Sequence, residues 1–153
     1  MTSEGLKAAF RRHPTGVAVV TALGPAGPVG LTASSVTSVS VSPPAVSLSV
    51  MNSRSARTIV TALSFVVHLL GARHAGVARD FARGDGPRFT PEQGWAVLPT
   101  GEPVLLEAAA ALRCTPLHRL PVGDSTVVVA SVAEVILGPD GGRLVYHDGR
   151  FVT

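Results

Sequence analysis

Short apolar runs alternate with polar, glycine-rich or proline-rich segments along most of this chain, and the pattern predicts a mainly β protein. Val17–Leu23 and Phe65–Leu70 are almost continuously apolar, which is typical of buried strands. Elsewhere apolar and small hydroxyl residues alternate with the period of two that a strand requires. The predicted strands cover residues 17–23, 29–39, 45–50, 65–70, 95–98, 107–115, 126–136 and 143–147.

Three short helices are predicted between the strands. The first carries Leu6, Ala9 and Phe10 on one face and ends at His13–Pro14, because proline disfavours helix in the residue before it. The others cover residues 53–63 and 74–83, with Gly84 as the stop of the last. Four consecutive alanines at 108–111 favour helix by propensity, but Leu112 and Cys114 alternate with polar neighbours, so residues 107–115 are interpreted as strand.

The order of these elements predicts an antiparallel Greek-key β-barrel with a few short helices, because strands outnumber helices and follow one another like hairpins. The turn Gly138–Gly142 predicts that residues 143–147 pair back onto 126–136. With 153 residues and no linker or repeat, we expect a single domain over 1–153.

The composition limits the possible partners. Apolar residues make up 46% of the chain and charged residues only 15%, so we expect part of the charge-poor surface to be buried against another subunit. The net charge of +3 comes from scattered arginines, with Lys7 the only lysine, and aromatic residues are 5%. This argues against nucleic-acid binding and is compatible with an anionic small ligand.

Other chemistries find little support in the sequence. The five histidines have no metal-ligand spacing, the acidic residues are dispersed, and no Gly-x-Ser-x-Gly elbow is present. Cys114 lies in an apolar stretch and is interpreted as a buried, inert thiol. Neither a signal pattern nor an apolar run long enough to cross a bilayer occurs, so the cytoplasm is the expected location.

A hydroxyl-rich stretch from Thr32 to Ser38 is the first candidate binding segment. Thr32, Ser34 and Ser38 share one face of the predicted strand, while Ser35 and Thr37 share the other. Small side chains let a flat ring lie close to the backbone, and hydroxyls can meet its polar rim. The alternative is an ordinary strand with a serine-bearing solvent face.

The segment Ser53–Thr58 is the second candidate, because it places two serines, two arginines and a threonine where a helix begins. A helix start favours anionic side chains over arginines, so a bound phosphate would account for Arg54 and Arg57. A ring site beside a phosphate site indicates a nucleotide-like cofactor. A simple capped helix is the alternative.

Two further polar segments are open to more than one interpretation. Gly123–Asp124–Ser125–Thr126 precedes a valine-rich strand and reads as a plain β-turn. His147, near Tyr146 and Arg150, lies in a polar terminal turn and could line a site.

Taken in order, these segments resemble the flavin reductase family with the FMN-binding split-barrel fold, the small reductase components of two-component flavin monooxygenases. The similar segments, which span nearly the whole chain, are 10–17, 30–40, 43–44, 52–58, 65–70, 81–82, 88–89, 101–105, 123–124 and 144–151.

The resemblance implies a homodimer in which each split barrel binds FMN or FAD, with NADH or NADPH as electron donor and a separate monooxygenase receiving the reduced flavin. The implied flavin-binding residues are Thr32, Ala33, Ser34, Ser35, Ser38, Val39, Asn52, Ser53, Ser55, Arg57, Thr58, Arg88 and Phe89. The implied nicotinamide-binding residues are Asp124, Ser125 and His147. No catalytic side chain and no metal are implied, because the flavin supplies the redox chemistry.

The chain departs from the family pattern at two places. Ser125 stands where the family commonly has a histidine associated with nicotinamide binding, and His68 stands in a strand that commonly reads Val-Asn-Val-Leu. The leading hypothesis is an NAD(P)H:flavin oxidoreductase. The alternatives are a flavin-binding protein of the same fold with little or no reductase activity, and a split-barrel interaction module without cofactor.

Overall fold

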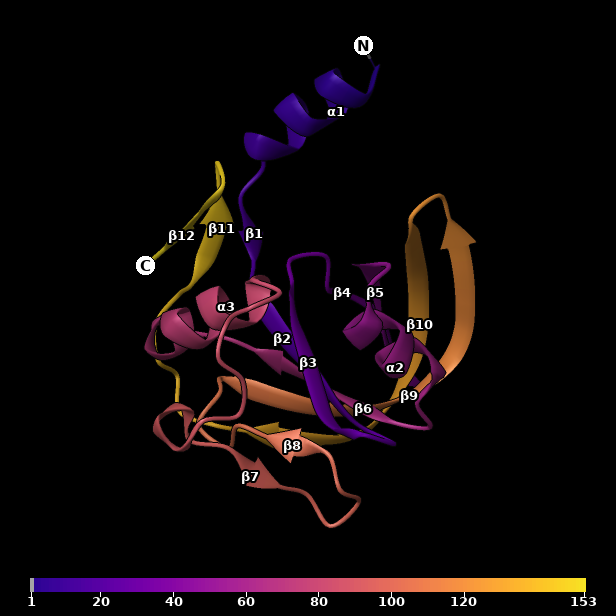
Figure 1. Ribbon diagram of the computed structural model, residues 1–153, viewed down its shortest axis with the longest axis vertical. Helices are drawn as coiled ribbons and strands as arrows, with labels where there is room; N and C mark the ends of the chain where they lie inside the picture. Colours follow the sequence, from indigo (N-terminus) through magenta and orange to yellow (C-terminus); the bar gives the residue numbers. More distant parts are fainter. Residues whose placement is uncertain (1) are drawn as a thin grey trace.

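The computed structural model describes residues 2–153 and is dominated by one curled antiparallel sheet (Figure 1). Seven strands form this sheet in the order β3-β2-β6-β9-β10-β5-β4. Their bounds are β2 Ala18–Gly24, β3 Gly27–Ala33, β4 Thr37–Val41, β5 Pro44–Met51, β6 Phe65–Leu69, β9 Ala110–Val122 and β10 Ser125–Leu137. Every pairing within the sheet is antiparallel.

The two edge strands, β3 and β4, are joined by only three residues, 34–36. A connection of three residues spans little more than about 10 Å, so the two edges must lie side by side at this end. The sheet therefore curls into a barrel that stays open between these edges. The expected antiparallel split barrel with a few short helices is confirmed.

The remaining elements are short and lie around the barrel (Figure 1). Helix α1 projects from the body beside a three-stranded sheet, while β7 and β8 lie at the opposite end. The elements outside the large sheet are α1 Thr2–Arg11, β1 Thr15–Gly16, α2 Arg54–Thr61, α3 Ala75–Ala82, β7 Ala96–Val97, β8 Pro103–Val104, β11 Val145–His147 and β12 Arg150–Val152, with 3₁₀ turns at Ala72–His74 and Pro91–Gln93.

Strands β2 and β6 are covered on both faces, which explains their continuous apolar sequences. Val20 and Val67 point into the barrel core with Phe65 and Ile59, whereas Val19 belongs to a second cluster beneath α3. The outer face of β6 is covered by a third cluster, in which Val66 packs with Val104 and Ala111.

Two of the sequence-based strand predictions were wrong. Residues 29–39 do not form one strand, because β3 pairs with β2 and β4 pairs with β5 on the far edge of the sheet. Residues 143–147 do not pair with 126–136. Strand β10 pairs with β9 along its length and with β5 from Ser125 to Ser131. Strand β11 pairs instead with β1 and β12.

The ambiguous segment after Glu107 is strand, as interpreted from the sequence, but the strand begins at Ala110 and runs on to Val122. Its last part and the start of β10 form a long hairpin arm that extends from the barrel (Figure 1). Leu117, Leu120 and Val122 on this arm are more than half exposed. The arm thus carries apolar side chains that nothing within residues 2–153 covers.

Candidate functional site

A cavity of about 660 Å³ lies where β3, the end of β5, the start of α2 and the end of α3 meet, and is called here the β3–α2 cavity. One wall is formed by small or apolar residues, Gly30, Leu31 and Ala33. The opposite rim carries hydroxyl and guanidinium groups. The lining residues are Gly30, Leu31, Thr32, Ala33, Ser34, Ser35, Ser49, Val50, Met51, Ser53, Arg54, Ser55, Phe81, Ala82, Arg83, Gly84 and Arg88.

Seven of the predicted flavin-binding residues line this one cavity: Thr32, Ala33, Ser34, Ser35, Ser53, Ser55 and Arg88. The structure thus joins the hydroxyl stretch to the helix start, two segments about twenty residues apart in the chain. Thr32 takes part mainly through its position, because its hydroxyl donates to the carbonyl oxygen of Ala78 at 2.7 Å.

Helix α2 begins at the rim of the cavity. Ser53 is its N-cap, and its side-chain oxygen accepts a hydrogen bond from the backbone N–H of Ala56 at 3.1 Å. The first turn contains no acidic side chain, but it places Arg54 and Ser55 in the lining of the cavity. The positive end of the helix is therefore combined with guanidinium and hydroxyl donors, a combination suited to a phosphate.

Arg88 lines the cavity but uses its donors to bind the protein backbone. It lies 5.0 Å from the ring centroid of Phe81. Burial lowers the pKa of its guanidinium, and the carboxylates of Asp80 and Asp85 oppose that shift. Its acceptors are the carbonyl oxygens of Gly30, Asp80, Phe81, Arg83 and Gly86, at distances between 2.7 and 3.4 Å. Arg88 therefore holds the loop after α3 against β3.

Two arginines that are not among the flavin-binding residues implied by the family resemblance also line the cavity: Arg54 and Arg83. Within residues 2–153, the guanidinium of Arg54 forms no hydrogen bond or ion pair, and Arg83 makes a single exposed ion pair of 3.5 Å with Asp85. Such an exposed pair contributes little to stability. The Ser/Arg cluster pointed to Arg54, whereas the position of Arg83 depends on how the end of α3 meets β3.

The other predicted flavin-binding residues lie outside this cavity. Ser38 faces an apolar groove beside β5, and Val39 is 54% exposed on the edge strand. Phe89 packs on Trp95 and on Phe81. The remaining three, Asn52, Arg57 and Thr58, lie on other sides of the α2 start.

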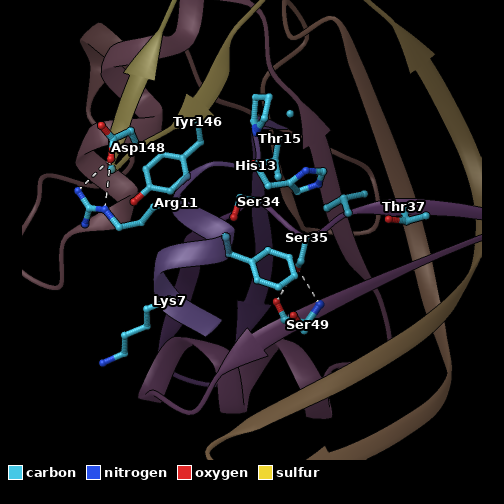
Figure 2. Close-up of a pocket in the computed structure, with 15 residues that line it drawn as sticks. Lys7, Arg11, His13, Thr15, Ser34, Ser35, Thr37, Ser49, Tyr146 and Asp148 are labelled. Carbon is cyan, nitrogen blue, oxygen red and sulfur yellow. Dashed lines mark hydrogen bonds and ion pairs between the residues drawn. The ribbon is translucent and has the colours of Figure 1, made fainter. Parts of the chain in front are cut away.

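A second cavity, of about 750 Å³, lies next to the first and is called here the α1 cavity (Figure 2). The two cavities share Ser34, Ser35 and Ser49. Its lining residues are Lys7, Phe10, Arg11, His13, Pro14, Thr15, Gly16, Ser34, Ser35, Val36, Thr37, Ser49, Tyr146, Asp148 and Gly149. The cavity thus combines basic and aromatic side chains from α1, the segment after it and the β11–β12 turn.

The shared wall is held by hydrogen bonds between a loop and a strand. The Ser35 hydroxyl donates to the Ser49 carbonyl oxygen and accepts from the Ser49 N–H, both at 2.9 Å (Figure 2). On the other side of the cavity, Arg11 pairs with Asp148 at 3.2 Å, and the N–H of Asp148 donates to the Arg11 carbonyl oxygen.

The predicted nicotinamide-binding residues do not come together within the described chain. Asp124 and Ser125 lie at the tip of the β9–β10 hairpin, where Ser125 pairs with Met51 at the edge of the β3–α2 cavity. His147 is exposed in β11 and lines neither cavity, although its neighbours Tyr146 and Asp148 line the α1 cavity.

His68 is buried in β6, and both of its ring nitrogens are hydrogen-bonded. Its Nδ1 lies 2.9 Å from the Val19 carbonyl oxygen and its Nε2 accepts from the Leu105 N–H at 3.1 Å, which fixes a neutral ring with its proton on Nδ1. Trp95 contacts the ring edge to face. Burial lowers the pKa of His68 to about 4, so the ring stays neutral at physiological pH.

Glu102 is the buried carboxylate of the same region. Burial alone would raise its pKa. Hydrogen bonds from Ser64 and Thr100 lower the pKa and contribute to a net downward shift. Cys114 is buried as well, and burial raises the pKa of its thiol to about 12, which agrees with an inert group. No group of three or more metal-ligating side chains occurs between residues 2 and 153.

The donor set of the β3–α2 cavity fits a phosphorylated ring compound. Small residues line one wall, and hydroxyl groups with two guanidiniums line the rim. No helix among the described residues is long and apolar enough to cross a membrane.

Comparison with known proteins agrees with this assignment. The family described as "Flavin reductase like domain" matches residues 10–153. The chain is 43% identical over 150 residues to NADH:FMN oxidoreductase of Rhodococcus qingshengii, covering 95% of this chain and 78% of that protein.

Solved structures give the same result. NADH:FAD oxidoreductase of Streptomyces globisporus, in complex with NAD and FAD fragments, superposes with a TM-score of 0.88 at 31% identity, covering 99% of this chain and 92% of that chain. The styrene monooxygenase flavin reductase of Pseudomonas putida S12 gives 0.84 at 26% identity, covering 97% and 96%.

Proposed function

Because the chain belongs to the flavin reductase-like family, we propose that it is an NAD(P)H:flavin oxidoreductase that reduces FMN or FAD. The observation that carries this proposal is the β3–α2 cavity, which combines small residues with the hydroxyl of Ser55 and the guanidinium of Arg54, neither of which bonds within residues 2–153, and with the exposed Arg83. A bound flavin would supply the hydride-accepting chemistry there. The side chains are left to bind, orient and exclude water.

The flavin ring would lie between β3 and the end of β5, against Ala33, Ser34 and Ser49. The phosphate would lie at the start of α2, where Ser55, Arg54 and Arg83 could donate to it. Ser38, Val39, Thr58 and Phe89 remain predictions from the family resemblance. Their positions support indirect roles through the edge strand, the helix and the loop.

The α1 cavity is the proposed site of the nicotinamide nucleotide, because it meets the β3–α2 cavity along three serines. Lys7 and Arg11, the latter paired with Asp148, lie on its α1 side and could bind the phosphates of a dinucleotide. Phe10 and Tyr146 offer ring faces. Asp124, Ser125 and His147 lie outside this cavity and remain predictions.

We further propose that residues 1–153 act as one domain in a homodimer, located in the cytoplasm. The exposed apolar side chains of α1 and of the hairpin arm, among them Leu6, Leu117 and Leu120, support a partner subunit. By analogy with the styrene monooxygenase reductase, a separate monooxygenase would receive the reduced flavin.

The test is an anaerobic assay with a catalytic amount of protein, excess FMN or FAD, and NADH or NADPH. We expect the absorbance of the nicotinamide donor and of oxidised flavin to fall together, at rates proportional to protein. The double variant Arg54→Ala/Arg83→Ala serves as a site-directed control and should need a higher flavin concentration. Rates equal to those without protein, with both flavins and both donors, would contradict the proposal.

A further inference from the structure

A smaller cavity of about 270 Å³ lies on the opposite side of α2, between this helix and β10, and is called here the β10–α2 cavity. Its lining residues are Asn52, Ser53, Ala56, Arg57, Val60, Thr61 and Thr126. It shares Ser53 with the β3–α2 cavity and no residue with the α1 cavity. The two cavities beside α2 therefore meet at the N-cap of the helix.

The β10–α2 cavity offers donors that the fold does not use. Within residues 2–153, the guanidinium of Arg57 forms no hydrogen bond or ion pair, although its carbonyl oxygen accepts from the Thr61 hydroxyl at 2.8 Å. Asn52 adds an amide and Thr126 a hydroxyl, while Ala56 and Val60 form an apolar floor. Polar groups around an apolar floor suit a nucleoside, whose base is flat and whose ribose is polar.

The size of this cavity is compatible with a small organic ligand. A volume of about 270 Å³ is many times the share of about 30 Å³ that one water molecule occupies. Helix α2 is fixed above it, because Ala56 and Ile59 are buried in the core. The helix wall of the cavity is therefore held by the core.

We propose that the flavin this protein prefers is the dinucleotide, with its riboflavin phosphate in the β3–α2 cavity and its adenosine half in the β10–α2 cavity. This inference rests on the proposed function. The two phosphates would cross the helix start at Ser53, the residue common to both cavities. Arg54 lies on the riboflavin side of this crossing and Arg57 on the adenosine side.

The connectivity of the cavities explains why the adenosine belongs to the flavin and not to the electron donor. The α1 cavity reaches the β3–α2 cavity only through Ser34, Ser35 and Ser49, on the side away from α2. A nicotinamide nucleotide bound in the α1 cavity would not contact Arg57 or Thr126, because neither residue lines that cavity. The arginine that the sequence predicted as a phosphate ligand thus becomes a residue that selects FAD over FMN.

The experiment compares FMN and FAD by equilibrium titration of flavin fluorescence, using the wild type, Arg57→Ala and a matched control. We expect the wild type to bind FAD more tightly than FMN, and Arg57→Ala to lower FAD affinity about tenfold with FMN affinity within about twofold. Arg79→Ala, an exposed arginine on α3 that lines none of the three cavities, should change neither.

A charge reversal gives a second measurement. Arg57→Glu should weaken FAD more than Arg57→Ala does and again spare FMN. Equal affinities for the two flavins in the wild type, or equal losses for both in Arg57→Ala, would overturn this inference and leave the flavin site in the β3–α2 cavity intact. If neither flavin binds the wild type, the proposed function and this inference both fail.

Discussion

Two sets of polar side chains in the molecule differ in how many hydrogen-bond partners they find within the protein. His68 and Glu102, which are buried, and Arg88, which lines the β3–α2 cavity, each have hydrogen-bond partners supplied by the chain. At the rim around α2, Arg54 and Arg57 have no partner within residues 2–153. The difference teaches that residue type alone does not identify a ligand site. What distinguishes the rim is donors that the fold has left unused.

The largest expected effect is the loss of folding stability when His68 becomes protonated. The pKa of His68 is lowered from 6.5 to about 4, so the unfolded chain binds its proton at a higher pH than the folded protein does. The stability that neutral His68 provides is therefore complete above pH 6.5 and is lost as the pH falls towards 4, by about 3 kcal/mol in total. Urea unfolding at pH 7 and at pH 4.5 measures the loss.

The variant His68→Asn separates this contribution from that of the carboxylates. Its stability should depend much less on pH between 6.5 and 4.5 than that of the wild type. Glu102, whose pKa is lowered, adds a loss of the same sign at more acidic pH. Identical pH dependence of wild type and variant in this interval would show that His68 is not held neutral as described.

The next largest effect concerns the arginine that holds the loop. Arg88→Ala removes a guanidinium bonded to five carbonyl oxygens, and it should lower the free energy of unfolding by about 2 kcal/mol. Arg88→Lys should recover little of this, because a lysine cannot reproduce the planar set of donors. Thermal unfolding of the three proteins tests the point, and an unchanged midpoint in Arg88→Ala would contradict the bracing role.

Substitutions of the rim arginines should lower flavin affinity and leave stability nearly unchanged. The double variant Arg54→Ala/Arg83→Ala should keep the unfolding free energy within about 0.5 kcal/mol of the wild type, because neither guanidinium has a strong internal partner. Flavin affinity should fall by about 1.5 kcal/mol, or roughly tenfold. A fluorescence titration and a denaturation curve on the same sample distinguish the two regions, and a loss of stability without a loss of affinity would reverse their assignment.

The smallest expected effect is on stability, from substitution of Ser35, one of the three serines shared by the two large cavities. Ser35→Ala removes both hydrogen bonds to the Ser49 backbone and should cost about 1 kcal/mol of stability. Amide exchange of Ser49 should accelerate, while exchange in β2 and β6 stays slow. Unaltered exchange at Ser49 would mean that the wall is held by other contacts.

The sequence predicted the class of fold because its signals were local. Continuous apolar runs marked β2 and β6, and the Ser/Arg cluster marked the start of α2. The break at residues 34–36 was missed, since hydroxyl and apolar residues alternate through it without glycine or proline. Pairing partners depend on the whole sheet, so the placement of β11 beside β1 could not be derived from the neighbouring turn.

The site was predicted in part for the same reason. Ser34, Ser35, Ser53 and Ser55 follow from their segments, and the structure places them in one cavity. Which face of α2 each arginine takes depends on the packing of Ala56 and Ile59, and that orientation sends Arg57 to the far side. The bracing role of Arg88 depends on carbonyl groups of another strand and loop, which no short motif records.

The three serines common to both large cavities also have a kinetic consequence. Molecules occupying the two spaces would be separated there by side chains of only two heavy atoms each, with no layer of bulky residues between them. Transfer of a hydride from a molecule in one cavity to a molecule in the other would then require no large movement of the protein. Because Ser34 lines both cavities, replacing it with a large residue should lower the rate of turnover.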